Sequence, residues 1–282
     1  MSHTTLVSTS TLARQYKNPE WVVFDCRFSL TDTQAGEKAY RQGHIPNARY
    51  VHLDKDLSSA ITSFTGRHPL PDFKILAKKL GDWGVNNRTQ VVVYDDMGNA
   101  FSSRLWWLLR CLGHNNVAVL NGGLNLWKKH GGKMTTKLPK VTSNTFRGYL
   151  DDGLYLSAEQ LEKALAKKSI KLIDARAVER YKGEQEPIDA VAGHVPYALN
   201  RPFQLNLDAE GKFLPNRELE QQFKQLIANV EPENVVHMCG SGVTACHNLL
   251  AMEIAHLSGS KLYTGSWSEW IRNKNRSIAK NL

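Results

Sequence analysis

The sequence repeats itself after about half its length. Four motifs of the first half return in the second half in the same order. They are residues 22–27 and 171–176, 43–48 and 193–198, 91–95 and 235–239, and 122–127 and 265–270. The offset between matching positions stays between 143 and 150 residues, so insertions and deletions are small. An ordered repeat of this kind predicts two copies of one domain.

The boundary between the copies follows from composition. Residues from about 131 to 150 are rich in Lys, Thr, Ser and Gly and have no apolar periodicity. We therefore predict a first copy over 1–135, a linker over 136–150 and a second copy over 151–282. The length of 282 residues suits two domains of ordinary size.

Each copy alternates short apolar runs with helical patterns, which predicts the α/β class. Short apolar strands separated by helices are typical of a parallel sheet flanked by helices on both faces. Strands are expected at 5–7, 22–25, 49–52, 91–94 and 117–120, and at 154–156, 172–174, 198–200, 235–238 and 261–263. Helices are expected at 157–166 and 217–227, among others. Ligands of such sheets bind at the carboxyl ends of strands, where Asp95 and Cys239 fall.

Cys239 opens a loop with the sequence Cys-Gly-Ser-Gly-Val-Thr, between a strand and a helical pattern. Backbone N–H groups of such a loop and the start of the next helix stabilise an anion. They favour a nucleophilic thiolate, and the same loop suits a persulfide. Gly240 and Gly242 are expected to allow close backbone approach and a positive φ, while Ser241 and Thr244 offer hydroxyl groups.

The alternative is that Cys239 is only a small buried apolar residue. The repeat argues against it, because the equivalent residue of the first copy is Asp95, in a loop of different sequence. One copy therefore has the features of a working site and the other those of an inactive partner.

These motifs together resemble the tandem-domain rhodanese family over essentially the whole chain. The resemblance rests on Asp-Cys-Arg and Asp-Ala-Arg, Gly-His-Ile-Pro and Gly-His-Val-Pro, the loop at 239–244, and the segment 265–270. It implies two rhodanese-like domains, the first inactive and the second catalytic. It also implies transfer of a sulfane sulfur from 3-mercaptopyruvate or thiosulfate, through a Cys239 persulfide, to a thiol or to cyanide.

The resemblance also assigns residues. Arg180 matches the arginine that binds the carboxylate or sulfonate of the donor, beside loop residues Gly240, Gly242, Val243 and Thr244. Asp54 and His68 match residues that the mercaptopyruvate branch groups with the loop serine, here Ser241, and the three could relay protons. His44 and His194 recur in both copies, as do the Asp-Arg pairs, and we expect them to be structural.

The loop favours 3-mercaptopyruvate as the donor. Thiosulfate-preferring relatives carry basic side chains directly after the cysteine, whereas this chain has Gly240 and Ser241. Against this, many mercaptopyruvate enzymes have a second arginine after a Glu-Pro pair, and here Ile188 follows Glu186 and Pro187. A thiosulfate-preferring rhodanese therefore stays open as an alternative.

Other functional classes fit less well. A cysteine phosphatase needs an arginine six positions after the cysteine, where this chain has Ala245. A non-catalytic binding or regulatory module would not need an intact cysteine loop. Cys239, Cys246, His237 and His247 lack zinc spacing, so we expect neither a metal nor a cofactor.

Charge and cysteine content predict which partners and which cellular compartment the protein has. The net charge of +9 is spread in short clusters, without the basic and aromatic stripe of nucleic-acid-binding proteins. We expect no nucleic-acid partner and no membrane partner, since no run of 18 apolar residues occurs. Four scattered cysteines and the lack of a signal peptide predict a cytoplasmic protein. The expected partners are a small anionic sulfur donor and a thiol acceptor such as thioredoxin.

Overall fold

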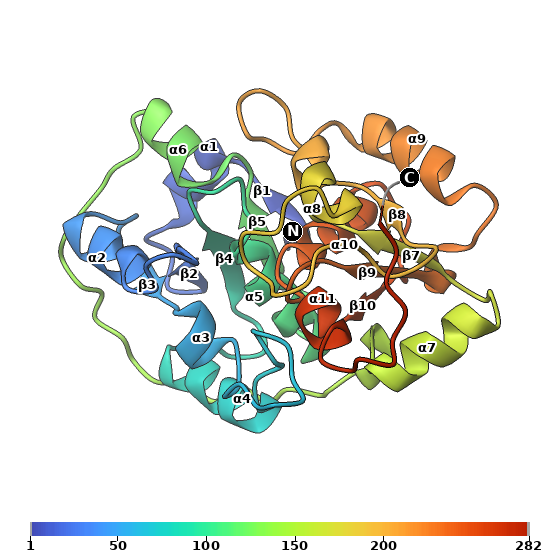
Figure 1. The fold of residues 1–282 in the computed structure, drawn as a ribbon. Helices are drawn as coiled ribbons and strands as arrows, with labels where there is room; N and C mark the ends of the chain where they lie inside the picture. The colour runs from blue at the N-terminus through green and yellow to red at the C-terminus, as the bar shows by residue number, and fades with distance from the viewer. Residues whose placement is uncertain (1, 281–282) are drawn as a thin grey trace. The chain divides into compact units, whose positions relative to one another are not determined.

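The computed structural model describes residues 2–280 and divides into two compact units (Figure 1). The first unit comprises the chain up to Ser59, Leu70–Asp151 and Leu207–Phe213. The second comprises Ala60–Pro69, Asp152–Asn206 and the chain from Leu214 on. Each unit thus takes in a short segment from the other copy of the repeat.

The first unit is a parallel five-stranded sheet with the strand order β1-β5-β4-β2-β3. Its strands are β1 (Leu6–Val7), β2 (Trp21–Asp25), β3 (Arg49–Tyr50), β4 (Gln90–Tyr94) and β5 (Val117–Leu120). Its helices are α1 (Thr9–Gln15), α2 (Ala35–Gln42), α3 (Leu53–Asp56), α4 (Phe73–Asp82), α5 (Ser102–Cys111) and α6 (Gly123–Lys129). Helix α5 packs on β4 and β5, and β4 lies in the middle of the sheet.

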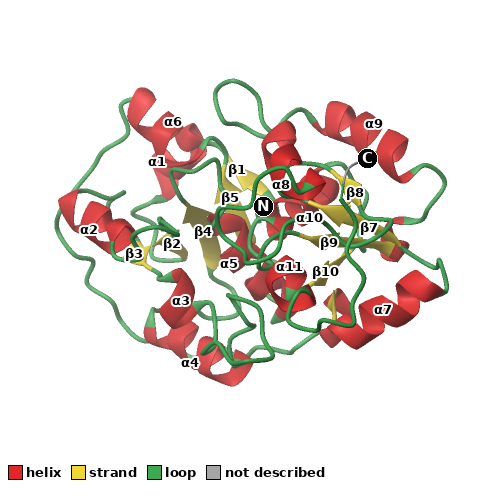
Figure 2. Cartoon of the chain, viewed as in Figure 1, coloured by secondary structure: helices red, strands yellow, loops and turns green. Residues whose placement is uncertain are grey.

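The second unit repeats this topology with the strand order β6-β10-β9-β7-β8, again all parallel (Figure 2). Its strands are β6 (Tyr155–Leu156), β7 (Lys171–Asp174), β8 (Leu199–Asn200), β9 (Val235–Met238) and β10 (Lys261–Tyr263). Its α-helices are α7 (Ala158–Ala166), α8 (Val178–Lys182), α9 (Asn216–Ile227), α10 (Ala245–Ile254) and α11 (Ser266–Trp270). Its 3₁₀ helices are η1 (Asp152–Leu154), η2 (Phe203–Asn206) and η3 (Pro232–Asn234). The predicted α/β class and the predicted duplication are both confirmed.

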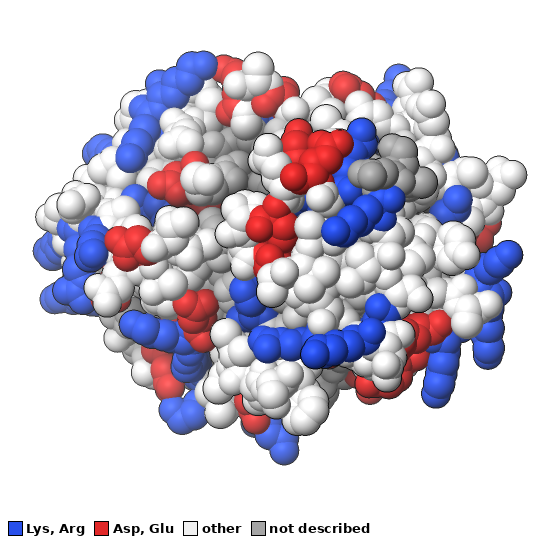
Figure 3. Space-filling view, viewed as in Figure 1, with Lys and Arg blue, Asp and Glu red and all other residues white. Residues whose placement is uncertain are grey.

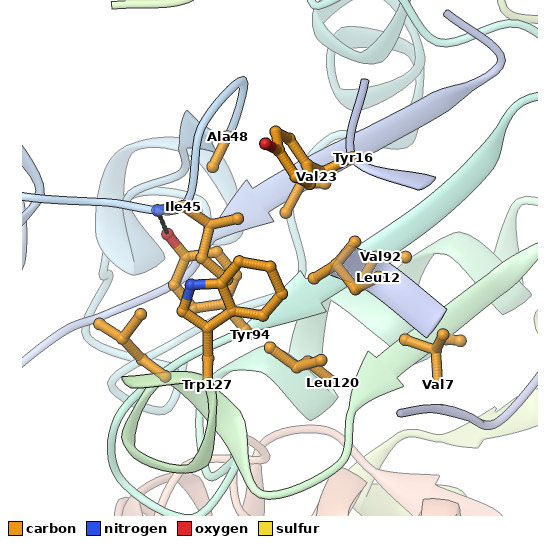
Figure 4. Packing of buried hydrophobic residues seen from close by; sticks show 12 residues of the cluster. Val7, Leu12, Tyr16, Val23, Ile45, Ala48, Val92, Tyr94, Leu120 and Trp127 are labelled. Atoms are coloured by element: carbon orange, nitrogen blue, oxygen red, sulfur yellow. Dashed lines mark hydrogen bonds between the residues drawn. The ribbon is translucent and has the colours of Figure 1, made fainter. Parts of the chain in front are cut away.

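Apolar side chains from strands and helices close the core of the first unit (Figure 4). Val92 and Tyr94 of β4 pack there with Leu12 of α1 and Trp127 of α6, and all four are almost fully buried. The hydroxyl of Tyr94 accepts the Ile45 N–H at 3.2 Å within this core. This packing fixes the end of β4, where the loop that begins at Asp95 follows the strand.

Helix α10 is buried on nearly every side, because it packs on β9, β10 and α9. Its sequence, Ala-Cys-His-Asn-Leu-Leu-Ala-Met-Glu-Ile, accordingly lacks a polar face. Helix α7, by contrast, has one apolar and one polar side. A capping box joins Ser157 and Gln160 at its start, and its apolar side faces the core.

The histidines of the two Gly-His motifs have equivalent surroundings. His44 stacks on Tyr40 with ring centroids 3.9 Å apart, and its Nδ1 lies 2.7 Å from the Tyr40 carbonyl oxygen. His194 stacks on Tyr181 at 3.8 Å, and its Nδ1 lies 2.8 Å from the Tyr181 carbonyl oxygen. Both are buried, and their presence in both units agrees with the structural role predicted for them.

A buried ion pair ends the second strand of each copy. Arg27 donates to Asp25 at 2.6 Å, and Arg176 donates to Asp174 at 2.7 Å. All four side chains are at most 5% exposed. A buried pair of this kind needs both partners, since either charge alone would be costly to bury.

Lysine and arginine side chains are interspersed with acidic and neutral ones on the face shown in Figure 3. Among residues 2–280, no helix is long and apolar enough to cross a bilayer. Nor do the described residues bring three His, Cys, Asp or Glu side chains together in a group that could hold a metal ion.

Candidate active site

Cys239 is the first residue after β9, the middle strand of the second sheet, and it is 1% exposed. Its N–H donates to Ser266 Oγ at 3.1 Å, and its carbonyl oxygen accepts the Trp267 N–H at 3.0 Å. The carbonyl of Gly240 accepts the Ser268 N–H at 2.9 Å. The first turn of α11 therefore holds the beginning of the loop in place.

The sulfur of Cys239 faces a backbone donor. The Gly242 N–H donates to Cys239 Sγ at 3.1 Å. This requires a turn at Gly242, whose φ is +77° and whose added Cβ would lie 2.4 Å from the Thr264 carbonyl oxygen. Only glycine fits both conditions without strain. An N–H directed at the sulfur is the feature expected of a loop that stabilises a thiolate.

The rest of the loop leads into α10. Val243 is buried, and Thr244 is the N-cap of the helix, although its side chain makes no capping hydrogen bond within the described residues. Cys246, one turn further on, donates its thiol to the Gly242 carbonyl at 3.4 Å. The thiol of Cys246 thus has a structural hydrogen bond at the base of the loop.

The prediction of a positive φ was right for Gly242 and wrong for Gly240, whose φ lies outside that region. Gly240 is needed for space instead. An added Cβ there would lie 2.8 Å from Arg67 Nη2 and 3.5 Å from Arg180 Nη2. Two guanidinium groups therefore approach the backbone next to Cys239.

His68 and Ser241 come together as predicted. His68 Nδ1 lies 2.7 Å from Ser241 Oγ, and both side chains are buried. Residues 60–69 belong to the second unit, which is why a histidine of the first copy reaches this loop. Asp54 lies in α3 of the first unit, half-buried, with its N–H donating to His52 Nδ1 at 3.1 Å. Its part in a relay stays a prediction.

Arg180 lies on α8 and is held by two carboxylates. It donates to Glu186 through Nη2 at 2.7 Å and through Nε at 3.0 Å. Its Nη2 also donates to Asp189 at 3.0 Å. The Ile188 and Asp189 N–H groups both donate to Glu186 Oε1 at 3.1 Å, so Glu186 organises this whole turn.

Arg67 is a site residue that the sequence analysis missed. It ion-pairs with Asp189 through Nη1, and its N–H donates to Ser268 Oγ at 3.0 Å. Its side chain is 23% exposed, and its buried Nε has no hydrogen-bond partner among residues 2–280. The only signal in the sequence is its position next to His68, because no periodicity places a loop arginine beside a loop 170 residues away.

The two carboxylates differ in their ionisation. Burial opposes the charge of Glu186, but Arg180 outweighs it and lowers the pKa of that carboxyl. For Asp189 burial prevails and raises the pKa, although Arg67 acts in the opposite direction. Asp189 is thus the less firmly stabilised anion of the pair.

The first unit holds a carboxylate where the second holds the cysteine. Asp95 follows β4 directly and is fully buried. Its Oδ1 accepts the Met97 and Asn99 N–H groups, and its Oδ2 accepts those of Phe101 and Ser102, all at 2.8 Å. A loop at this position of the fold therefore surrounds an anion with backbone donors.

Comparison with known proteins gives consistent results. The rhodanese-like domain model matches residues 8–130 and again 157–273. The chain is 43% identical, over 99% of both chains, to a probable 3-mercaptopyruvate sulfurtransferase of Pseudomonas aeruginosa. It is 33% identical to the thiosulfate sulfurtransferase of Rattus norvegicus, over 95% of this chain and 92% of that one.

Among solved structures, SseA of Escherichia coli, a 3-mercaptopyruvate sulfotransferase with the rhodanese fold, aligns with a TM-score of 0.81 and 30% identity. The alignment covers 95% of this chain and all of SseA. Two family matches in one chain agree with the duplicated sheets and the repeated motifs. The chain therefore belongs to the family of tandem rhodanese-like sulfurtransferases.

Proposed function

We propose that Cys239 is the nucleophile and that it carries the transferred sulfur as a persulfide. The observation that carries this proposal is the Gly242 N–H directed at Cys239 Sγ at 3.1 Å, with the guanidinium groups of Arg67 and Arg180 close to the adjacent Gly240. A backbone donor and nearby cations favour a thiolate and then a persulfide anion. The backbone of Gly240, Gly242, Val243 and Thr244 lines this cradle.

The sulfur moves in two displacements. The Cys239 thiolate attacks the outer sulfur of the donor, forming an S–S bond. With thiosulfate the old S–S bond breaks and sulfite leaves with the electron pair. With 3-mercaptopyruvate the C–S bond breaks, and the electron pair passes to C3 as the pyruvate enolate, which gains the proton lost by the donor thiol. An acceptor thiolate or cyanide then attacks the outer sulfur of the persulfide and releases the Cys239 thiolate.

The donor's charged end is bound by Arg180 and Arg67. Both lie within reach of the Gly240 backbone, and guanidinium groups bind carboxylates and sulfonates through paired hydrogen bonds. Arg67 supplies the second guanidinium that Ile188 does not provide. We infer that 3-mercaptopyruvate is the preferred donor, because Arg67 and Arg180 are already partly neutralised by Asp189 and Glu186.

Ser241 and His68 serve the proton step. Their 2.7 Å contact would let the serine hydroxyl pass a proton between the imidazole and the donor, with Asp54 as the third member of the relay. Mercaptopyruvate needs such a step because its enolate must be protonated, whereas sulfite leaves as an anion.

The acceptor we propose is a protein thiol such as thioredoxin, in the reducing cytoplasm. All four cysteines of the chain are free thiols, which fits such a compartment. A reducing compartment would also supply the thiolate for the second displacement.

A steady-state comparison tests this function. Turnover is measured with 3-mercaptopyruvate and with thiosulfate, first with cyanide and then with thioredoxin as the acceptor. We expect turnover with both donors and a higher kcat/KM for 3-mercaptopyruvate. A higher value for thiosulfate would instead make the chain a thiosulfate-preferring rhodanese. Absence of turnover and of cyanide-releasable sulfur would favour a non-catalytic binding module.

A further inference from the structure

One carboxylate lies between the two arginines of the proposed donor site. Asp189 ion-pairs with Arg67 through Oδ1, and its Oδ2 accepts from Arg180 Nη2 at 3.0 Å. Its side chain is 5% exposed, compared with 23% for Arg67 and 17% for Arg180. Asp189 therefore occupies the guanidinium edges that an anionic donor would use.

The charged side chains around Gly240 sum to zero before a donor binds. Arg67 and Arg180 contribute two positive charges, and Glu186 and Asp189 contribute two negative ones. Arg176 also donates to Glu186 at 3.3 Å, and its positive charge is balanced by Asp174. Glu186 is held by Arg180 and by two backbone N–H groups, so it is fixed. Among residues 2–280, the Asp189 carboxylate accepts side-chain hydrogen bonds from Arg67 and Arg180 and has no backbone donor of this kind.

We propose that Asp189 is an internal counter-ion that sets which donor charge the site accepts. It competes with the donor for Arg67 and Arg180, and it leaves the site near neutrality. Such a site accommodates one additional negative charge more readily than two. Asp189 thereby favours a monoanionic donor such as 3-mercaptopyruvate over the dianion thiosulfate. This inference rests on the proposed function and deepens it.

Coulomb's law predicts how donor preference should change when the charge of Asp189 is removed. Removing one negative charge from the site improves the binding of an anion in proportion to the anion's charge. A dianion therefore gains about twice the free energy that a monoanion gains. We expect Asp189→Asn to raise the kcat/KM ratio of thiosulfate to 3-mercaptopyruvate by about tenfold or more. The change should appear in KM, with kcat for 3-mercaptopyruvate altered much less.

The experiment measures both donors in the wild type, in Asp189→Asn and in Asp189→Ala. The asparagine keeps an oxygen for one arginine, and the alanine removes both contacts, so the two variants separate charge from arginine positioning. Inhibition by sulfate, a dianion, and by acetate, a monoanion, measures anion binding separately from the rate of sulfur transfer. Sulfate inhibition should strengthen more than acetate inhibition in both variants.

The matched control is Asp208→Asn, which makes the same change in net charge at a half-exposed residue of the first unit. Its carboxylate lies 3.9 Å from Lys212 Nζ and accepts the Glu210 and Lys212 N–H groups, away from the donor site. It should leave the donor ratio unchanged. An unchanged ratio in both Asp189 variants, or an equal loss for both donors, would overturn the inference while wild-type turnover still supported the sulfurtransferase function. A wild type inactive with either donor would instead refute the proposed function itself.

Discussion

His68 Nδ1 lies 2.7 Å from the hydroxyl oxygen of Ser241, two residues beyond Cys239. The two residues are 173 positions apart in the sequence, yet both belong to the second compact unit. A histidine beside a loop serine can exchange a proton with a bound donor, so this contact makes a specific kinetic prediction.

We expect Ser241→Ala and His68→Asn to lower kcat for 3-mercaptopyruvate by about a hundredfold, as loss of general acid–base catalysis does. Turnover of thiosulfate should fall much less, because sulfite leaves without a proton. The double variant should be no slower than the worse single variant, since both belong to one relay. Equal losses with both donors would argue for a structural role of the pair.

Cys239→Ser should abolish sulfur transfer and leave the fold intact, because the serine hydroxyl lacks the nucleophilicity of a thiolate. Intact-mass measurement after treatment with the donor should show one added sulfur on the wild type and none on the variant. Circular dichroism provides the check on folding. A serine variant with undiminished turnover would contradict the proposed nucleophile.

The other three cysteines should be dispensable for turnover. Cys26, Cys111 and Cys246 are all buried. Burial, with the charge of Asp95 next, raises the pKa of Cys26 well above its usual value and keeps that thiol protonated. A triple Cys→Ala variant should lose some stability to small cavities but keep its kcat. Complete loss of activity in a folded triple variant would show that one of them takes part in transfer.

Arg180→Ala and Arg67→Ala should each raise KM about ten- to a hundredfold, from the loss of about 1.5–3 kcal/mol in a charge-assisted contact. Each change removes one of the two arginine partners of Asp189, so thermal melting should accompany the kinetics. Arg272→Ala, at an exposed arginine of the second unit without an ion pair to the site, serves as the control. An unaltered KM in both variants would remove these arginines from donor binding.

Stability should fall with acid because of His237. Burial, helped by the charge of Arg201, lowers the pKa of this histidine from 6.5 to about 3. Between these two pH values His237 is protonated in the unfolded chain and neutral in the folded chain. Lowering the pH therefore favours unfolding. The contribution is about 1.4 kcal/mol for each pH unit below 6.5.

Urea titrations between about pH 7 and pH 5 measure this slope. His237→Gln should flatten it, although the variant is less stable near neutrality. His256→Gln, at an exposed histidine, should keep the slope of the wild type. Parallel curves for the wild type and His237→Gln would show that other groups carry the acid response.

Much of the fold was predictable because it depends on local patterns. Apolar runs placed all ten strands within two residues of their observed ends, and the helices over 157–166 and 217–227 were right within a residue. The shortest strands, such as β3, were predicted too long, since pairing with β2 ends after Tyr50. The predicted domain boundaries stay predictions, since the contact-based units cross them in two places.

The candidate site was predictable only in part. The Cys239 loop and Arg180 are contained in motifs, so the sequence points to them directly. Arg67 and the counter-ion role of Asp189 depend on where a loop of one copy packs, and periodicity carries no such information. The bend at Gly240, which forms without a positive φ, was also missed, because glycine permits a positive φ without requiring it.

The exchange of short segments between the copies bears on how such a chain can be divided. Cutting at the linker would put residues 60–69 on one fragment and the Cys239 loop, which they serve, on the other. It would likewise separate Leu207–Phe213 from the unit to which that segment belongs. Gene duplication thus produced two sheets that resemble independent modules, while each half contributes a part without which the other is incomplete.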